Sequence, residues 1–427
     1  MYLLYDVIFT LCLLVSGPVL LARMAFRRKY RESFFAKLGI WPGRLRRRIR
    51  RLDRPVWIHA LSVGELISAL PLVRLFHSEH PDIPLVVSTS TETGQALARS
   101  RLEGVAGGVF YAPLDVRPVV RSVVCRIRPR MFLLVETDLW PCLLDILEKE
   151  NVPSAFVNVR ISSRSANRYQ HIRPLMRRIF RCFSFIGAQT EGDARRLGRI
   201  GAPLTRVQVT GNLKFDIRPE PLSDGERRAF AKDLGWVYGK QPIIVAGSTH
   251  AGEERLLFRA LARLRKSSPN LVMLVAPRDR ERFDAVHELA AGMGFDPVVS
   301  SSKPKDAHAV VVLDVFGQLS RAYAIASAAF VGGSLVPQGG HNLLEPAVHG
   351  IPVLFGPHTE DFRDMAEEME NEKAGLRVRD ENHLVDVLEK LLRDSTLRSE
   401  LGERGRRFCV RNRGAVKKTL DHIGALS

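Results

Sequence analysis

Two carboxylates in the first half of the chain have positions suited to acid–base chemistry. Glu65 begins a helix shortly after the apolar run Val56–His59, and Glu136 directly follows a second apolar run, Met131–Val135. Glu65 could take a proton from an acceptor hydroxyl, and Glu136 could bind and position an acceptor rich in hydroxyls. The structural alternatives are a helix-start glutamate stabilised by the helix dipole and, beside Glu136, an ordinary helix N-cap.

Basic side chains accompany these carboxylates. Arg160 and Arg164 follow a third apolar run, Ala155–Asn158, and two arginines can hold a phosphate or carboxylate through paired hydrogen bonds. Lys214 lies at the junction between the two halves of the chain, from which it could reach a ligand cleft. The alternative for the two arginines is a basic loop on a protein that is basic throughout.

The second half contains a glycine-rich segment, residues 332–342, between the apolar runs Ala329–Val331 and Ile351–Phe355. Glycines let a backbone approach a ligand closely, and a helix N-terminus offers free N–H groups to an anion. Glu345 lies in the first turn of a short helix expected at Leu343–His349, where it could accept hydrogen bonds from sugar hydroxyls. The alternative is an ordinary strand–helix–strand connection with a well-capped helix.

Two further residues of the second half follow apolar runs. Ser248 comes after Ile243–Gly247, and Arg278 comes after Leu271–Ala276. Small hydroxyl groups and helix N–H groups near Ser248 suit a phosphate, which Arg278 could also reach. The segment Gly247–Glu254 fits a helix capping box between a Ser or Thr and a Glu equally well.

The elements that must position these groups alternate along the chain. Apolar runs typical of strands occur at Val56–His59, Leu85–Ser90, Met131–Val135, Ala155–Asn158, Phe183–Ala188 and Val207–Thr210, and again at Ile243–Gly247, Leu271–Ala276, Val310–Asp314, Ala329–Val331 and Ile351–Phe355. Helices are expected between them, including Gly64–Phe76, Arg117–Arg128, Pro141–Lys149 and Thr190–Gly201. This alternation predicts two α/β domains with mainly parallel sheets, separated by a composition shift at Gly211–Lys240. Ligands of such sheets bind at the carboxyl ends of the strands. The tail, Leu397–Leu426, is expected to be helical.

Composition and absent motifs narrow the function. The net charge of +18 favours an anionic partner. The five cysteines are scattered without a CxxC pair, so neither a zinc site nor a disulfide framework is indicated. The sequence contains no Walker A, GxGxxG, GxSxG or HExxH motif, and a catalytic metal is therefore not expected.

The amino-terminal segment predicts a membrane anchor. Met1–Phe26 is strongly apolar over about 20 residues, near the length that a bilayer core requires. Arginines and a lysine follow it at once, which places the remainder of the chain on the cytoplasmic side. A cleaved signal peptide is the competing interpretation, but in signal peptides the positive charge precedes the apolar run.

A run of arginines between Gly43 and Arg54 comes next. Its place after the anchor favours contact with anionic headgroups over a solvated linker. A membrane-tethered nucleic-acid binder is disfavoured because no aromatic residues are interleaved with the arginines.

Taken together, seven blocks of this sequence resemble 3-deoxy-D-manno-octulosonic acid (Kdo) transferases. The blocks are WIHALSVGE, ETDLWP, NVRISSRS, TGNLKFD, GSTHAGEE, APRDRER and GGSLVPQGGHNLLEPA with GIPVLFGPH, and they occur in the order of that family. The resemblance implies the GT-B fold, two facing Rossmann-like domains. It further implies inverting transfer of Kdo from CMP-Kdo to a lipid A precursor at the cytoplasmic face of the bacterial inner membrane, without a metal or other cofactor. The alternative within the fold is a UDP-sugar transferase or epimerase.

The resemblance also implies roles for individual residues. Glu65 would be the general base, and Glu136 and Arg160 would bind the acceptor. The donor-binding residues would be Lys214, Ser248, Arg278, Gly339, Asn342 and Glu345, with Glu345 on the ribose. This sequence departs from the family pattern at Val159, Ser163, Asp279 and Asp361.

The expected domain boundaries follow from the resemblance. Residues 1–30 would be the anchor helix, 31–215 the acceptor-binding domain, and 216–427 the domain that binds the nucleotide sugar. The last helix would pack back on the acceptor-binding domain.

Overall fold

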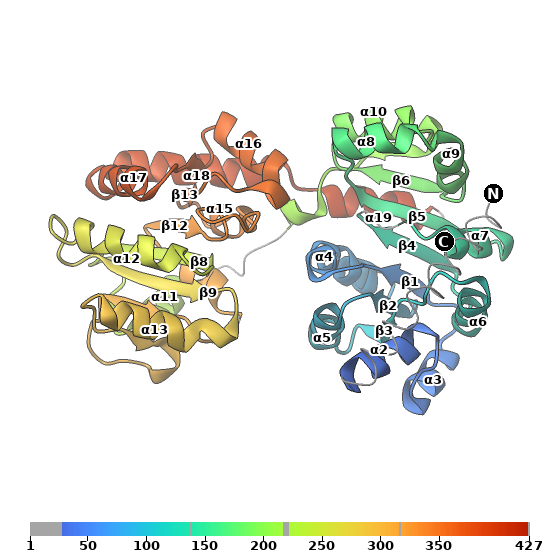
Figure 1. Ribbon diagram of the computed structural model, residues 1–427, viewed down its shortest axis with the longest axis horizontal. Helices are drawn as coiled ribbons and strands as arrows, with labels where there is room; N and C mark the ends of the chain where they lie inside the picture. Colours follow the sequence, from blue (N-terminus) through green and yellow to red (C-terminus); the bar gives the residue numbers. More distant parts are fainter. Residues whose placement is uncertain (1–27, 137–138, 217–221, 316, 426–427) are drawn as a thin grey trace. The chain divides into compact units, whose positions relative to one another are not determined.

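The structure is a computed structural model that describes residues 28–427 except 137–138, 217–221, 316 and 426–427. The chain divides into two compact units. Unit 1 comprises Met1–Asp216 and Asn412–Ser427, and unit 2 comprises Ile217–Arg411. Each unit is built on its own parallel sheet (Figure 1).

Unit 1 contains a seven-stranded parallel sheet in the order β3-β2-β1-β4-β5-β6-β7. Its strands are β1 (Val56–His59), β2 (Leu85–Thr89), β3 (Ala106–Tyr111), β4 (Met131–Val135), β5 (Ser154–Val159), β6 (Phe185–Ala188) and β7 (Val207–Val209). The chain builds outward from β1 through β2 to β3, then returns to β4 on the other side of β1. The point between β1 and β4 is therefore the topological switch point, where ligands of such sheets bind.

Helices cover both faces of this sheet. They are α2 (Arg28–Lys37), α3 (Gly43–Arg50), α4 (Val63–Glu79), α5 (Glu92–Arg101), α6 (Arg117–Ile127), α7 (Pro141–Lys149), α8 (Ser163–Gln170), α9 (Arg173–Arg181), α10 (Glu191–Arg199) and α19 (Ala415–Gly424), with the 3-10 turns η1 (Leu204–Arg206) and η2 (Leu213–Asp216). One core lies under α3, α6, α7, α9 and α10, and the other lies under α4, α5 and α19. The strands other than the edge strands β3 and β7 are buried on both sides; in β1, Trp57 enters the first core while Val56 and Ile58 enter the second. This explains why they read as continuous apolar runs.

Strand β3 was not expected from the sequence. Its segment AGGVFY contains Gly107 and Gly108, which weaken a strand pattern. A Cβ on Gly107 would lie 2.8 Å from Leu52, and one on Gly108 would lie 3.0 Å from Ile49. Both glycines therefore allow α3 and the residues after it to pack directly on the edge of the sheet.

Unit 2 repeats the architecture with a different strand order, β10-β11-β9-β8-β12-β13-β14. Its strands are β8 (Ile243–Thr249), β9 (Val272–Pro277), β10 (Val298–Val299), β11 (Val310–Val312), β12 (Ala328–Val331), β13 (Val353–Phe355) and β14 (Leu376–Arg377). Its helices are α11 (Asp224–Asp233), α12 (Glu253–Leu264), α13 (Phe283–Gly292), α14 (Leu319–Tyr323), α15 (Leu344–Ala347), α16 (Arg363–Asn371), α17 (Glu381–Arg393) and α18 (Ser395–Arg411), with η3 (Arg280–Arg282), η4 (Ser300–Ser302) and η5 (Glu360–Phe362). The switch point of this sheet lies between β8 and β12. The short strands β10 and β14 are two residues each and gave no pattern in the sequence.

The tail is helical as expected, and it forms two helices. Helix α18 ends and helix α19 begins around Gly414, whose φ of 102° is left-handed. The Asp216 carboxylate accepts hydrogen bonds from the backbone N–H groups of Gly414 (2.6 Å) and Val416 (2.5 Å). These bonds tie the start of α19 to unit 1, and Figure 1 shows α19, in red, beside the green strands of that unit.

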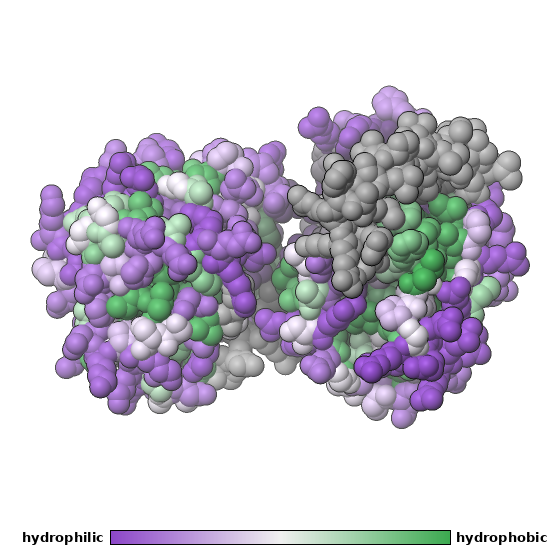
Figure 2. All heavy atoms as spheres, turned by 60° about the horizontal axis from the view of Figure 1, so that its bottom comes forward, coloured by the Kyte–Doolittle hydropathy of each residue, from purple (hydrophilic) through white to green (hydrophobic). Residues whose placement is uncertain are grey.

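The proposed anchor lies almost wholly outside the described residues, since the description begins at residue 28. Within the described part of the chain, no helix combines the length and the apolar character needed to cross a bilayer. On the face that Figure 2 shows, hydrophilic residues predominate on both units.

Candidate functional site

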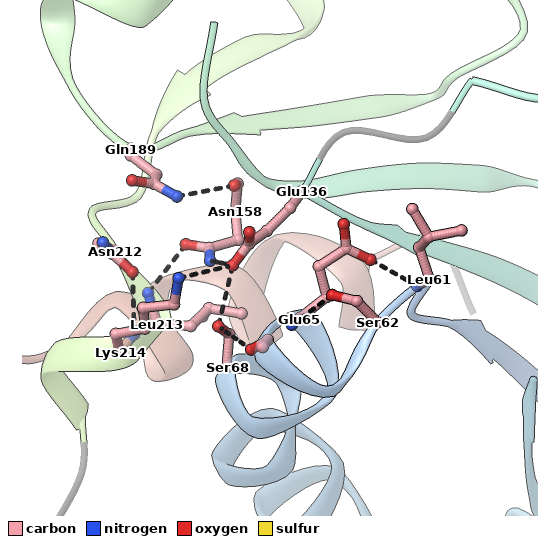
Figure 3. A network of polar contacts seen from close by, with 11 residues as sticks. Leu61, Ser62, Glu65, Ser68, Glu136, Asn158, Gln189, Asn212, Leu213 and Lys214 are labelled. Atoms are coloured by element: carbon pink, nitrogen blue, oxygen red, sulfur yellow. Dashed lines mark hydrogen bonds and ion pairs between the residues drawn. The ribbon is translucent and has the colours of Figure 1, made fainter. Parts of the chain in front are cut away.

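The two carboxylates singled out in the first half of the chain both lie at the switch point of unit 1. Glu65 is in the first turn of α4, which follows β1, and Glu136 directly follows β4. Since β1 and β4 are paired neighbours, the two carboxylates come to the same edge of the sheet. Figure 3 shows both side chains together with the polar contacts that each one makes.

Glu65 is only 6% exposed and folds back over the start of its helix. Its Oε2 accepts a hydrogen bond of 2.5 Å from the backbone N–H of Leu61, and its own N–H donates to Ser62 Oγ at 3.4 Å (Figure 3). The helix-start interaction predicted as the structural alternative is therefore present. It also fixes the carboxylate at the sheet edge, as a general base requires.

Glu136 is the centre of a network of three donors. Its Oε1 accepts from Ser68 Oγ at 2.9 Å and from Asn158 Nδ2 at 3.1 Å, and it pairs with Lys214 Nζ at 3.3 Å (Figure 3). The donors come from α4, β5 and η2, so the carboxylate joins three elements that are distant in sequence. Ser68 and Asn158 were not singled out from the sequence, although Asn158 stands in one of the seven blocks.

The backbone at this edge adopts left-handed conformations at non-glycine residues. Glu136 has a φ of 68° and Asn158 a φ of 58°. At Asn158 the pairing of β5 with β6 is irregular, and Asn158 Oδ1 accepts from the N–H of Leu213 at 2.9 Å. Such conformations cost about 1–3 kcal/mol each and cluster at functional sites, because the surrounding structure must enforce them.

Lys214 lies in unit 1, on the 3-10 turn η2, where Asn212 Oδ1 accepts from its N–H at 3.0 Å. It was expected at the hinge, with a role in donor binding. The structure places it beside Glu136, the proposed acceptor-binding carboxylate, and its role toward the donor stays a prediction. Arg160 follows β5 and is half-buried, outside the network of Figure 3.

Behind the first strand, His59 is fully buried. Its Nδ1 lies 2.9 Å from Ser88 Oγ, and its ring meets that of Trp140 edge to face, with centroids 6.0 Å apart. Burial lowers the pKa of His59 to about 4, although the hydrogen bond to the Ser88 backbone opposes this shift. The imidazole is therefore neutral at physiological pH.

Glu253 organises the edge of unit 2 in a way that sequence reasoning missed. Its buried carboxylate accepts from four backbone N–H groups, those of His250 (3.0 Å), Gly333 (2.7 Å), Ser334 (2.9 Å) and Leu335 (2.9 Å). The capping box considered for this segment is wrong, because the N-cap of α12 is Gly252 and makes no side-chain bond. Glu253 instead ties the end of β8 to the glycine-rich loop that follows β12.

The strands β8 and β12 approach each other very closely at their carboxyl ends. A Cβ on Gly332 would lie 2.4 Å from the carbonyl oxygen of Ser248, so only glycine fits there. Ser248 itself has a φ of 57° and lies at an irregularity in the pairing of β8 with β9. The expected phosphate-binding serine is thus held in a strained backbone at the switch point of unit 2.

Two histidines from the two loops meet at this edge. His250 Nε2 lies 2.8 Å from His341 Nε2, and the rings are stacked with centroids 5.1 Å apart. Burial and then the charges of Arg278 and His250 lower the pKa of His341 to about 4, while Asp279 opposes this. One imidazole must donate to the other, so both cannot be protonated at these nitrogens.

Two of the remaining predicted donor residues, Gly339 and Asn342, lie in the loop after β12, Glu345 lies in α15, and Arg278 follows β9. Asp361 N donates to Gly339 O at 3.0 Å, and Asn342 Oδ1 accepts from Leu344 N at 3.1 Å at the start of α15. Burial raises the pKa of Glu345, and the charge of Arg278 lowers it. Unit 2 therefore brings the predicted residues to one region, but no ligand contact tests their roles. Among the described residues, no group of three or more His, Cys, Asp or Glu side chains could hold a metal ion.

Solved structures with this arrangement define the class of protein. The chain is similar to UDP-GlcNAc 2-epimerase from Neisseria meningitidis bound to UDP-GlcNAc, with a TM-score of 0.56 and 13% identity over 86% of this chain and 99% of that one. It is also similar to HepE from Anabaena in complex with UDP and glucose, with a TM-score of 0.59 and 14% identity over 88% and 99%. These similarities show a GT-B-like fold of two parallel-sheet α/β domains.

Similar sequences identify the family. Residues 32–217 match the family described as 3-deoxy-D-manno-octulosonic-acid transferase (kdotransferase). The 3-deoxy-D-manno-octulosonic acid transferases of Haemophilus influenzae and Bordetella pertussis are each 33% identical, over 86% of both chains and 87% of both chains respectively. The corresponding protein of Chlamydia trachomatis is 29% identical over 98% of this chain and 95% of its own. The chain belongs to the Kdo transferase family and is a glycosyltransferase.

Proposed function

We propose that this enzyme transfers Kdo from CMP-Kdo to a phosphorylated, acylated lipid A precursor in lipopolysaccharide biosynthesis. One observation carries the proposal: Glu65 and Glu136 lie at the same switch point, in a chain that belongs to the Kdo transferase family. A carboxylate at the sheet edge suits deprotonation of a sugar hydroxyl. A second carboxylate, held by three donors, suits positioning of the same sugar.

The reaction is a single displacement. The acceptor hydroxyl gives its proton to Glu65 while its oxygen forms a bond to the anomeric carbon of Kdo. The bond from that carbon to the phosphate oxygen breaks, and CMP leaves with the electron pair. Attack from the face opposite the leaving group inverts the configuration, so no covalent enzyme intermediate is needed.

Unit 2 supplies the groups that would stabilise the leaving nucleotide. Ser248 lies at the end of β8, Arg278 follows the adjacent strand β9, and the loop carrying Gly339 and Asn342 follows β12, the other neighbour of β8. Charge that develops on the phosphate is stabilised by donors that are already oriented before the reaction. Glu345, whose carboxylate is half-buried in the same loop, is proposed to accept from the ribose hydroxyls.

The amphipathic start of unit 1 supports a membrane location. Phe35 and Ile40 are 41% and 59% exposed. They precede α3, in which Ile49 is buried against β3 while Arg44, Arg46 and Arg47 are exposed. Basic residues near an anionic surface contribute roughly 1 kcal/mol each. Together with an anchor in residues 1–30, this surface would hold the enzyme at the cytoplasmic face of the bacterial inner membrane.

The direct test is a donor comparison with purified enzyme. CMP-Kdo and UDP-GlcNAc are each supplied with a lipid A precursor, and the products are weighed by mass spectrometry. The proposal predicts Kdo addition from CMP-Kdo and no product from UDP-GlcNAc. Turnover of the UDP-sugar alone would make the enzyme another member of the GT-B class. The same mass measurement counts the Kdo residues added.

A further inference from the structure

A cavity of about 240 Å³ lies in unit 1 beside the proposed base. It opens at the carboxyl ends of β1, β2, β3 and β4, and its lining includes Lys37, Leu61, Ser90, Leu114, Leu139 and Trp140. Whole ligand pockets usually measure about 300–1,000 Å³, so this cavity has the size of a site for one part of a ligand. None of its lining residues was singled out from the sequence.

Three side chains of the lining can donate hydrogen bonds, and none of them has a hydrogen-bond acceptor among the described residues. Ser90 Oγ and Trp140 Nε1 are buried and make no hydrogen bond in the structure. Lys37 is half-buried, its Nζ lies 5.9 Å from the centre of the Tyr111 ring, and burial lowers its pKa. No carboxylate among the described residues forms an ion pair with Lys37, and none of the described residues that line the cavity is acidic.

Buried donors without partners are rare, because each costs about 1–3 kcal/mol of lost hydration. Three side chains that can all donate, one of them cationic, match a group that only accepts. A phosphate offers such oxygens and a negative charge. The apolar residues of the lining, Leu61, Leu114 and Leu139, suit hydrocarbon next to that phosphate rather than a free ion in water.

Leu61 connects the cavity to the proposed catalytic carboxylate. This residue lines the cavity, and its backbone N–H donates to Glu65 Oε2. Trp140, also in the lining, packs edge to face on His59 at the end of β1.

We propose that this cavity binds a phosphate group of the acceptor through Lys37, Ser90 and Trp140, and so positions the acceptor hydroxyl at Glu65. The inference rests on the proposed function, because it assigns part of that acceptor. The three side chains are positioning residues, which act on the reaction by placing the sugar. Loss of one of them should raise KM for the acceptor and leave donor binding unchanged.

The experiment compares acceptors in neutral detergent micelles: the full precursor and matched forms that each lack one phosphate. The variants are Lys37→Met and Trp140→Phe, with Arg101→Met as the control that removes one exposed positive charge from the same unit. Lys37→Met and Trp140→Phe should each raise KM for the full precursor tenfold or more. On one dephosphorylated form the KM of these variants should equal that of the wild type. The control should show no such dependence.

Stability separates this role from a structural one. Trp140 Nε1 has no partner in the free protein, so Trp140→Phe removes an unpaired donor and should keep or raise Tm while it raises KM. Unchanged KM in both variants, or an equal KM increase on every acceptor, would overturn the inference. So would a defect that appears only with anionic phospholipid vesicles, since the cavity would then bind membrane lipid.

Failure of the proposed function would look different. In that case the wild-type enzyme would transfer no Kdo to any of the acceptors. Equilibrium binding of the full precursor, with fluorescence as the signal, then still tests the cavity. Binding that requires both Lys37 and the same phosphate would uphold the site, and binding that ignores them would overturn it.

Discussion

The two sheet edges of this enzyme each lie at a topological switch point, and they differ in chemistry. In unit 1 the switch point carries carboxylates, with Glu136 held by Ser68, Asn158 and Lys214. In unit 2 the switch point carries glycines and paired histidines, and the carboxylate of Glu253 accepts hydrogen bonds from backbone N–H groups. A carboxylate with side-chain partners can exchange them for substrate. A carboxylate saturated by backbone holds a loop in place.

The edges also share one device. Each has a polar residue in a left-handed conformation at an irregular strand pairing, Asn158 in β5 and Ser248 in β8. Such an irregularity re-aims the side chain and the chain that follows it. The same backbone conformation therefore occurs at the proposed proton-accepting edge of unit 1 and at the proposed anion-binding edge of unit 2.

After loss of the proposed base itself, the largest effect is expected from the Glu136 network. Glu136→Gln should lower kcat/KM for transfer by about a hundredfold, because a positioned carboxylate is lost and its ion pair with Lys214 is broken. CMP affinity should not change. The measurement is steady-state transfer together with calorimetric CMP binding.

The control for this prediction is the double variant Glu136→Gln/Lys214→Met. It removes both charges, and a double-mutant cycle separates their coupling from their individual roles. If the pair acts on substrate, the double variant stays as inactive as the single one. Recovery of transfer in the double variant would make the pair a structural ion pair only.

A large effect on unit 2 is expected from Glu253→Gln. The amide cannot accept from four N–H groups, so unit 2 should lose about 3 kcal/mol of stability and bind CMP more weakly. The matched control is Glu254→Gln, which is equally buried and breaks a pair with Arg282 at 2.6 and 3.1 Å. The control should lose stability yet keep its CMP affinity. Equal loss of CMP affinity in both variants would remove the special role given to Glu253.

A fall in pH should destabilise both units, because each contains at least one histidine that burial keeps neutral in the folded state. Burial lowers the folded-state pKa of His59 to about 4, against about 6.5 when unfolded. Between these values the unfolded chain binds a proton that the folded chain does not, so stability falls as the pH drops from 6.5 towards 4. For His59 the full loss is about 3 kcal/mol. Unit 2 has two such groups, because burial also lowers the pKa of His341 and His349 to about 4.

Tryptophan fluorescence can assign this loss to a unit. Unit 2 contains a single tryptophan, Trp236, so Trp236→Phe leaves a signal from unit 1 alone. Urea unfolding at pH 7 and pH 5 should show a lower stability at pH 5. His59→Gln should reduce the difference in unit 1 by about 2 kcal/mol, because the interval from pH 6.5 to pH 5 covers about 1.5 pH units at about 1.4 kcal/mol each. An unchanged difference would show that His59 does not carry the pH dependence of unit 1.

The smallest effect is expected at the left-handed residue of unit 2. Ser248→Gly relieves a strained conformation and should raise stability by up to about 1 kcal/mol. CMP affinity should fall if the hydroxyl meets the phosphate. Lys373→Gly, at an exposed residue with a φ of 54°, is the control and should raise stability without changing CMP affinity.

The sequence predicted the buried centre of both sheets well, for a physical reason. Strands such as β1 and β4 are buried on both faces and appear as unbroken apolar runs, and both have the predicted bounds. Helix α7 also has its predicted bounds, because Pro141 sets its start. The edge strand β3 was missed because packing with α3 requires its two glycines, and such a contact is not visible in a local window.

The candidate site was predicted as a set of positions rather than as a network. Glu65 and Glu136 could be found because each follows an apolar run. Their partners could not, because the bonds that join Ser68, Asn158 and Lys214 to Glu136 span distant parts of the chain. Glu253 was read as a local cap for the same reason: its main partners lie about 80 residues away.

The central claim is that unit 1 supplies the base while unit 2 holds the nucleotide. The most direct test is Glu65→Gln, measured for Kdo transfer and, separately, for CMP binding by calorimetry. The account predicts that transfer falls by about a thousandfold or more while CMP affinity stays within twofold of the wild type. Transfer at the wild-type rate, or loss of transfer together with loss of CMP binding, would contradict it.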